Sequence, residues 1–377
     1  MHFVSTTAEE LLYIFGMTKR LAVVLCNLGG PDSPAAVQPF LQNLFSDPAI
    51  LRVPAPVRWF LARLISRLRA RKAQAIYAKL GGGSPLLPNT QAQAKVLEQS
   101  LQQTLPNTKV FIAMRYWHPF TKEAVEQIKS WNPDSVALVS LYPQFSTTTT
   151  ASSFDEFTKE ASRQGLIAPV HPVCCYPEDD AWTEAVAQTI QGSGVHLAHT
   201  RILFSAHGLP KKIVDAGDPY PLQVKASAKA VLEKLTTKPK DSVVCYQSKV
   251  GPMEWLKPST EEEIQRAGRE GIPILVVPIA FVSEHSETLV ELDDEYRHLA
   301  TLAKVPKYTR APTVQTTPRF IEGLTKLIIQ ATQKPAEEYL CALKDTACFN
   351  PQGKCSRVNE GGLLPDANFP RLSAIKD

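Results

Sequence analysis

The most constraining feature of this sequence is the alternation of short, uniformly apolar runs with longer amphipathic stretches. The apolar runs are Leu21–Cys26, Val110–Met114, Ser135–Leu141, Ile202–Ser205, Ser242–Tyr246 and Ile272–Ile279. Strands that are apolar on both faces are typical of parallel sheets covered by helices on both sides. The alternation therefore predicts a doubly wound α/β fold.

The amphipathic stretches predict the crossover helices. They span Pro34–Phe45, Val57–Tyr77, Thr90–Thr104, Lys122–Ser130, Ser153–Ala161, Asp180–Ile190, Leu222–Leu235, Ser259–Glu270, Ser286–Leu302 and Pro318–Thr332. A fresh series of strands begins after about Tyr142, which indicates two similar Rossmann-like halves. We expect an N-terminal extension (1–18), a first α/β domain (19–143), a second α/β domain (144–317) and a C-terminal helix with a cysteine-containing tail (318–377).

The composition excludes several classes of protein. With 44% apolar and 21% charged residues, the chain is not a disordered or fibrous protein, and it has no apolar run long enough to span a membrane. A net charge of +4 is too small to indicate a nucleic-acid partner. Glu9 and Glu10 stand where a signal peptide carries basic residues, so we expect a cytoplasmic protein with reduced cysteines. No glycine-rich nucleotide-binding motif is present, so no nucleotide cofactor is expected.

Acidic residues recur after the apolar run at Ile272–Ile279. Glu284, Glu287, Glu291 and Asp294 follow one another at spacings of three, four and three, which would place them on one face of a helix, with His285 beside them. Such a row suits transient handling of a divalent cation or its protons, although a solvated helix face is the alternative. His207 ends another predicted strand, where a neutral imidazole can accept a proton.

Two further segments combine cations with aromatic rings at predicted strand ends. They are Arg115–Pro119, with Tyr116 and Trp117, and the stretch from Gln247 to Trp255, with Lys249. Flat aromatic rings beside cations suit a large planar anion, whereas the alternative is that the rings fill the core.

The segment 57–72 is basic and amphipathic. Val57, Leu61, Leu64 and Leu68 share one face, and no acidic residue occurs between Asp47 and Glu98. This pattern predicts either an interfacial helix or lid, or an ordinary surface helix with a core-facing stripe.

Three tail cysteines have regular spacing, Cys341-x6-Cys348-x6-Cys355. In a reduced compartment such spacing favours metal ligation, and a fourth thiolate from Cys174 or Cys175 would complete a zinc or [2Fe-2S] site. Cysteines with no common role are the alternative.

Together these motifs resemble the ferrochelatase family. The matching segments are Leu25–Pro31, Lys79–Leu86, Arg115–Pro119, Tyr142–Ser146, Phe204–Pro210, Gly217–Pro221, Gln247–Thr260 and Pro278–Tyr296. The resemblance implies two similar α/β halves with a porphyrin cleft between them. It also implies insertion of Fe²⁺ into protoporphyrin IX, the final step of haem biosynthesis.

The resemblance also assigns roles to particular residues. His207 and Glu287 would be catalytic and would meet the Fe²⁺ substrate, and Glu284, His285, Glu291 and Asp294 would form a proton or metal path. Porphyrin would contact Leu28, Arg115, Tyr116, Tyr142, Lys249 and Trp255. The segment 57–72 corresponds to the family's pocket lip, which is associated with peripheral contact at the inner face of the membrane. A contact with the preceding haem-pathway enzyme is a further expectation.

The cysteines resemble those of bacterial members that carry a [2Fe-2S] cluster. Animal members with a cluster use a cysteine directly after the motif at Tyr142–Ser146, where this chain has Thr147. The resemblance therefore implies Cys175 as the internal ligand with Cys341, Cys348 and Cys355, and Cys174 as the second choice.

Three other functions remain open from the sequence. One is a cobalt or nickel chelatase acting on sirohydrochlorin, although that family lacks the segment Gln247–Trp255. The second is a coproporphyrin III ferrochelatase. The third is a haem or porphyrin carrier without turnover, for which a proton acceptor facing His207 would serve no purpose.

Overall fold

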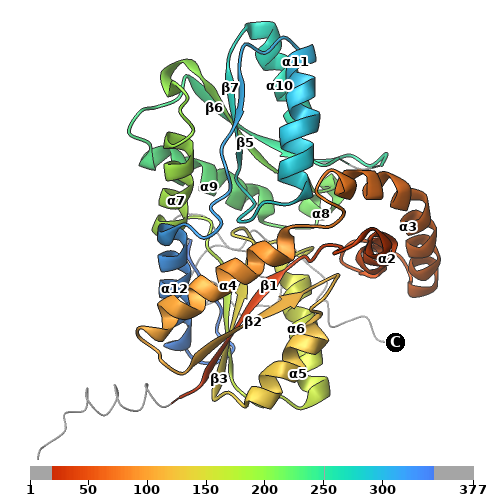
Figure 1. Cartoon of the computed structure of the whole chain (residues 1–377), viewed down its shortest axis with the longest axis vertical. Helices are drawn as coiled ribbons and strands as arrows, with labels where there is room; N and C mark the ends of the chain where they lie inside the picture. Colours follow the sequence, from red (N-terminus) through yellow and green to blue (C-terminus); the bar gives the residue numbers. More distant parts are fainter. Residues whose placement is uncertain (1–18, 250, 344–377) are drawn as a thin grey trace, which may run out of the picture.

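The computed structural model describes residues 19–249 and 251–343 and contains two parallel sheets, one above the other in Figure 1. The first sheet has the order β2-β1-β3-β4-β9, and the second has the order β6-β5-β7-β8. The first sheet consists of β1 (Leu21–Asn27), β2 (Thr108–Met114), β3 (Ser135–Ser140), β4 (Val170–Cys175) and β9 (Leu340–Cys341). The second consists of β5 (Arg201–His207), β6 (Asp241–Gln247), β7 (Ile274–Pro278) and β8 (Tyr308–Arg310).

Helices cover both faces of each sheet. Those before β5 are η1 (Pro34–Ala36), α2 (Val37–Ser46), α3 (Ala55–Ala78), α4 (Leu86–Gln102), α5 (Thr121–Trp131), α6 (Thr150–Gln164), α7 (Asp180–Gln191) and η2 (Leu197–His199). Those after β5 are α8 (Lys211–Asp215), α9 (Tyr220–Lys234), α10 (Thr260–Glu270), the π-helix η3 (Glu287–Tyr296), α11 (Arg297–Leu302) and α12 (Pro318–Thr332).

The central strand β1 shows why its sequence forms a doubly covered sheet. Every residue of β1 is buried, and successive side chains point to opposite faces. Val23 and Leu25 belong to a core with Leu97 of α4, whereas Val24 belongs to a core with Phe157 of α6. A fully apolar strand is therefore required at this position.

One apolar core extends through both halves of the molecule. It contains Leu25 of β1 and Leu324 of α12, and also Phe204 of β5 and Val277 of β7. The opposite face of the second sheet has a separate core that includes Leu203 of β5. The two sheets are thus joined by a continuous core rather than by a linker.

The six predicted strands and ten predicted helices are all present, while three strands were not predicted. β4 contains His171 and Pro172, which interrupt its apolar pattern, and β8 and β9 are only three and two residues long. Because β4 and α6 pack on the first half, the second sheet begins at Arg201, later than the start at residue 144 expected from sequence. Cys175, the last residue of β4, therefore lies in the first half.

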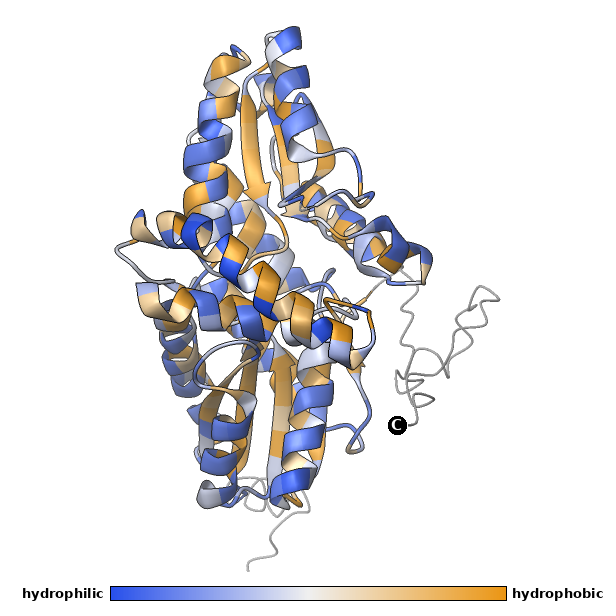
Figure 2. Cartoon of the chain, turned by 90° about the vertical axis from the view of Figure 1, so that its right-hand side faces the viewer, coloured by the Kyte–Doolittle hydropathy of each residue, from blue (hydrophilic) through white to orange (hydrophobic). Residues whose placement is uncertain are grey.

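The helix α3 projects with α2 from the first half (Figure 1). The side of α3 that packs against the rest of the protein carries small residues, because Ala62, Ser66 and Ala70 are buried. Its large apolar residues are exposed, namely Val57, Trp59, Phe60, Leu64 and Leu68. Figure 2, which views the molecule from this side, shows hydrophobic and hydrophilic segments side by side along the helices. In the described part of the chain, no helix has the length and apolar content needed to cross a bilayer.

Candidate active site

The centre of the site lies at the carboxyl ends of two neighbouring strands of the second sheet. His207 is the last residue of β5, and Glu287 begins η3 shortly after β7, which pairs in parallel with β5. His207 Nε2 lies 3.7 Å from Glu287 Oε1, and His285 Nε2 lies 3.5 Å from Glu287 Oε2. Glu287 thus stands between two imidazoles, as expected for a ligand site at this edge of an α/β sheet.

The two imidazoles control the charge of Glu287. Burial alone would raise the pKa of Glu287, but the charges of His207 and His285 more than offset burial and lower it to about 2. Burial would lower the pKa of His285, and its contact with Glu287 reverses this so that the pKa is raised. The site therefore presents an ionised carboxylate beside the imidazole of His285, whose raised pKa favours holding a proton.

The pKa of Glu291 is shifted in the opposite direction from that of Glu287. Burial, and then the negative charge of Glu287, raise the pKa of Glu291. Its carboxyl accepts hydrogen bonds from Ser248 N at 2.8 Å, Ser248 Oγ at 2.6 Å, Gln247 Nε2 at 3.1 Å and Tyr296 Oη at 3.0 Å. Opposite pKa shifts in two neighbouring carboxyl groups are what an acid–base pair requires.

The predicted acidic row is divided in the structure. Glu284 precedes η3, and its Oε1 accepts hydrogen bonds from Arg310 Nη1 and Thr313 N, each at 2.9 Å. Asp294 is exposed and pairs with Lys79, which follows α3. Because η3 is a π-helix, the three–four–three spacing does not produce the single face that an α-helix would give. Glu287 and Glu291 remain beside His207.

Arg115 and Tyr116 of the first half are held by one carboxylate. A single carboxylate oxygen, Asp47 Oδ2, accepts hydrogen bonds from Tyr116 Oη and Ser152 Oγ at 2.7 Å and pairs with Arg115 Nη2 at 2.8 Å. Burial and the nearby groups, Glu287 among them, raise the pKa of Tyr142, whose hydroxyl is buried without a hydrogen-bond partner in the described residues. Tyr142 thus brings an unpaired polar atom to the region of Glu287.

The remaining predicted porphyrin contacts have different surroundings. Trp255 packs against Gly208, where an added Cβ would lie 3.1 Å from the indole ring and 2.9 Å from the carbonyl oxygen of Gln247. Leu28 packs against the core cluster that contains Tyr116, and Lys249 is exposed. The close approach at Gly208 keeps the indole beside His207.

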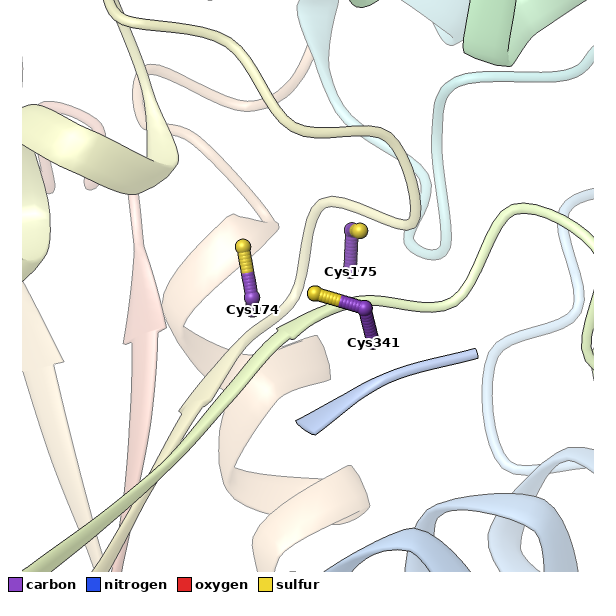
Figure 3. Close-up of side chains that lie close together, drawn as sticks. All are labelled: Cys174, Cys175 and Cys341. Carbon is purple, nitrogen blue, oxygen red and sulfur yellow. The ribbon is translucent and has the colours of Figure 1, made fainter. Parts of the chain in front are cut away.

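Three thiols meet in the first half. Cys174 and Cys175 end β4, and Cys341 lies on β9, which pairs in parallel with β4. Their sulfur atoms lie within 4.8 Å of one another, and Figure 3 shows the three side chains close together. This donor set fits a thiolate metal site, because convergent sulfur atoms at this separation match zinc or iron–sulfur ligation. Cys348 and Cys355 lie outside the described residues.

Sequence reasoning missed two residues that shape the site. Asp47 organises the Arg115–Tyr116 wall, and its signal was its position as the last acid before a long stretch without acidic residues. Ser248 holds Glu291 from a left-handed backbone conformation with φ of 65°. No sequence pattern predicts that a serine adopts this left-handed conformation.

The two packed parallel sheets form a two-domain, chelatase-like α/β fold. Two solved structures of SirB from Bacillus subtilis share the fold, one of them described as a sirohydrochlorin chelatase. SirB with Fe³⁺ has a TM-score of 0.50 at 14% identity and covers 83% of this chain and 95% of its own. SirB of the subspecies spizizenii with cobalt has a TM-score of 0.51 at 12% identity and covers 84% and 97%.

The chain belongs to the ferrochelatase family, whose model matches residues 20–332. Ferrochelatase of Rickettsia bellii is 48% identical over 340 residues, 89% of this chain and 95% of the relative. Ferrochelatase of Caulobacter vibrioides is 50% identical over 323 residues, 84% of this chain and 92% of the relative. The resemblance expected from the sequence motifs is confirmed, and the chain is an enzyme with ferrochelatase activity that inserts Fe²⁺ into a porphyrin in haem biosynthesis.

Proposed function

We propose that the porphyrin is protoporphyrin IX and that His207 and Glu287 form the centre at which its pyrrole protons leave and the incoming Fe²⁺ is met. The position of Glu287 between His207 and His285 carries this proposal. Insertion exchanges two N–H protons of the macrocycle for Fe²⁺, so the overall charge balances when two protons leave. A carboxylate that stays ionised and imidazoles that can accept a proton supply both requirements.

Protons then need an exit from the pair. Glu291 accepts a hydrogen bond from Ser248, the residue after β6. Its raised pKa allows it to hold a proton while Glu287 is ionised. We assign Glu291 to proton transfer together with His285. Glu284 is paired with the Arg310 side chain and Asp294 with the Lys79 side chain. These two carboxylates contribute to the path only if the pairs separate.

Residues of both halves would hold the macrocycle. The ring of Tyr142 and the side chain of Leu28 from the first half, and the indole of Trp255 from the second, offer the flat and apolar contacts that a porphyrin needs. Lys249 and Arg115 offer cations for the two propionates. Binding energy from these contacts can favour a bent ring whose nitrogen lone pair faces the metal.

An anaerobic insertion assay tests the proposal with three substrates. Fe²⁺ is supplied with protoporphyrin IX, coproporphyrin III or sirohydrochlorin, and kcat/KM is compared between them. We expect protoporphyrin IX to be preferred. A preference for coproporphyrin III would overturn the substrate assignment, and tight binding of every porphyrin without turnover would indicate a carrier.

The exposed apolar face of α3 supports a peripheral membrane contact at the pocket lip. Trp59, Phe60 and Leu68 are more than half exposed, with 61%, 60% and 73% of their surfaces accessible. Arg63 stacks over Trp59 at 5.1 Å from the ring centroid. An apolar face lined with arginines is the pattern of a helix that lies in the interface of an anionic bilayer.

The thiol site is proposed to hold a [2Fe-2S] cluster. Cys175 and Cys341 would contribute together with Cys348 and Cys355, and Cys174 is the alternative internal ligand. Such a group supplies one-electron chemistry and links the folding of the cysteine segment to the presence of iron.

A further inference from the structure

A buried glutamine on α4 joins the first half to the segment that carries His285. Gln93 is only 1% exposed. Its Nε2 donates to the carbonyl oxygens of Val282 at 3.1 Å and Gln315 at 3.0 Å, and its Oε1 accepts from Ser283 Oγ at 3.0 Å. Both ends of this amide are therefore used across the boundary between the two halves.

A second side chain of α4 extends the same contact. Asn89 Nδ2 donates to the carbonyl oxygen of Glu284 at 2.9 Å, one helical turn before Gln93. Three consecutive residues are thus hydrogen-bonded to α4, Val282 and Glu284 through their carbonyl oxygens and Ser283 through its side-chain hydroxyl. Gln315 N also donates to Val282 O, at 2.9 Å.

This segment determines how the ring of His285 is oriented. His285 Nδ1 lies 3.0 Å from the carbonyl oxygen of Ser283, and since a carbonyl only accepts, Nδ1 carries the hydrogen. Nε2 is then directed to Glu287 Oε2. A shift of the Ser283 peptide would rotate the ring away from Glu287.

We propose that Gln93 is a positioning residue that acts on the reaction through Ser283 and His285. The inference rests on the proposed function, in which His285 serves the Glu287 centre. In this proposal α4, a helix of the first half, fixes the position of His285 relative to Glu287 in the second half. Misplacing a reacting group by about 1 Å can lower a rate by about 10².

A double-mutant cycle on the full-length enzyme tests the inference. The variants are Gln93→Leu, His285→Ala and the double variant, and kcat and the KM for protoporphyrin IX are measured for each. We expect Gln93→Leu to lower kcat by about tenfold with an unchanged KM, and to change kcat by less than about twofold in the His285→Ala background, because coupled residues are not additive.

The control is a second buried glutamine that also bridges the halves. Gln144 Nε2 donates to Ser227 Oγ at 2.8 Å and Ile279 O at 3.1 Å, but it does not contact the segment Val282–Glu284. The loss of kcat caused by Gln144→Leu should be the same fold-change in the wild-type and His285→Ala backgrounds. If Gln93→Leu does not fold, Asn89→Leu replaces it in the same cycle, because Asn89 is only half-buried.

Three results would overturn the inference. They are an equal loss from Gln93→Leu in both backgrounds, a wild-type kcat for Gln93→Leu, and a wild-type kcat for His285→Ala. Failure of the proposed function can be told apart from failure of this inference. It would appear as full activity after substitution of His207 or Glu287, independently of the result of the double-mutant cycle.

Discussion

At the scale of single residues, the site depends on carboxyl groups that differ in their neighbours rather than in their chemistry. Glu287 faces two imidazoles and has a pKa lowered to about 2, whereas Glu291 faces Glu287 and has a raised pKa. One turn of helix thus supplies both a permanent anion and a group that can carry a proton.

The first prediction concerns His207. His207→Ala should lower kcat by about 10² or more and leave porphyrin affinity within a few-fold, the scale expected for loss of a general base. Initial rates and porphyrin fluorescence titration measure the two quantities. The matched control is His199→Ala on η2, whose ring stacks on His196. A near wild-type kcat for the His207 variant would remove this residue from the mechanism.

The second prediction concerns the pH dependence of stability. The folded-state pKa of Glu287 is below its ordinary value of 4.5, so its stabilisation is complete above about pH 4.5 and is lost as the pH falls toward about 2. Wild type should therefore exceed Glu287→Gln in free energy of unfolding by up to about 3 kcal/mol at pH 7. The difference should shrink at pH 3.

Urea unfolding at the two pH values measures this difference. Glu126→Gln, on α5, is the control for losing a carboxylate elsewhere. A difference of the same size at pH 3 and pH 7 would show that Glu287 is not stabilised in its ionised form.

The proximity of His207 and Glu287 was predictable from the sequence, but the buried residues that hold the surrounding segments were not. His207 and Glu287 were found because each follows an apolar strand whose carboxyl end lies at the same sheet edge. Asp47 and Gln93 contact residues more than 65 positions away in the sequence, and local patterning contains no information about such pairs.

At the scale of elements, two helices depart from what their sequences predict. The stretch Ser286–Leu302 has the spacing of an amphipathic α-helix, yet Glu287–Tyr296 is a π-helix whose carboxylates have different partners, Ser248 for Glu291 and Lys79 for Asp294. The helix α3 turns small residues inward and large apolar ones outward. Periodicity identifies a helix but cannot tell which face meets the protein.

The third prediction concerns membrane contact through α3. Replacing Arg63, Arg67 and Arg71 by Glu should weaken binding to anionic vesicles by at least about 100-fold, since each basic residue near such a surface is worth about 1 kcal/mol. Co-sedimentation at low and high salt measures the effect. The charge-matched control replaces Lys225, Lys229 and Lys238, which line a surface hollow beside α9 and β6. Equal binding by wild type and the Arg variant would leave α3 without a membrane role.

The fourth prediction concerns the β4–β9 edge. Anaerobically purified protein should contain about two irons and two acid-labile sulfides per chain, and Cys341→Ser should lose both. Cys175→Ser and Cys174→Ser identify the internal ligand, because only loss of the true ligand should abolish the iron content. Cys245→Ser, a buried cysteine hydrogen-bonded by Thr260, is the control. Wild-type protein without iron and sulfide would exclude the cluster.

At the scale of the whole molecule, the two halves share one apolar core and several buried polar contacts. The core passes from β1 and α12 to β5 and β7. Gln93 and Gln144 cross the same boundary with buried hydrogen bonds. The doubled architecture was predictable from the repeated strand pattern. The boundary was not, because β4 resembles a loop in sequence and β9 joins the first sheet from the far end of the chain.

The fifth prediction is that both halves unfold in a single transition. Because the core is continuous, neither half can keep its apolar surface buried alone. Hydrogen exchange followed by mass spectrometry should show protection of β1 and β5 lost at the same urea concentration. Two separated losses of protection would show that each half is stable by itself.

The placement of α12 and β9 also has a consequence for biosynthesis on the ribosome. These elements complete the face of the first half, because α12 packs on α4 and α7 and β9 pairs with β4. They are translated only after all strands of the second sheet. At about 5–20 residues per second, the roughly 140 residues from the end of α7 to the end of α12 take about 7–30 s to translate, and during this time Leu97 and Trp182 lack the apolar cover of α12. The nascent chain therefore exposes, during translation, apolar surface of the kind that chaperones bind.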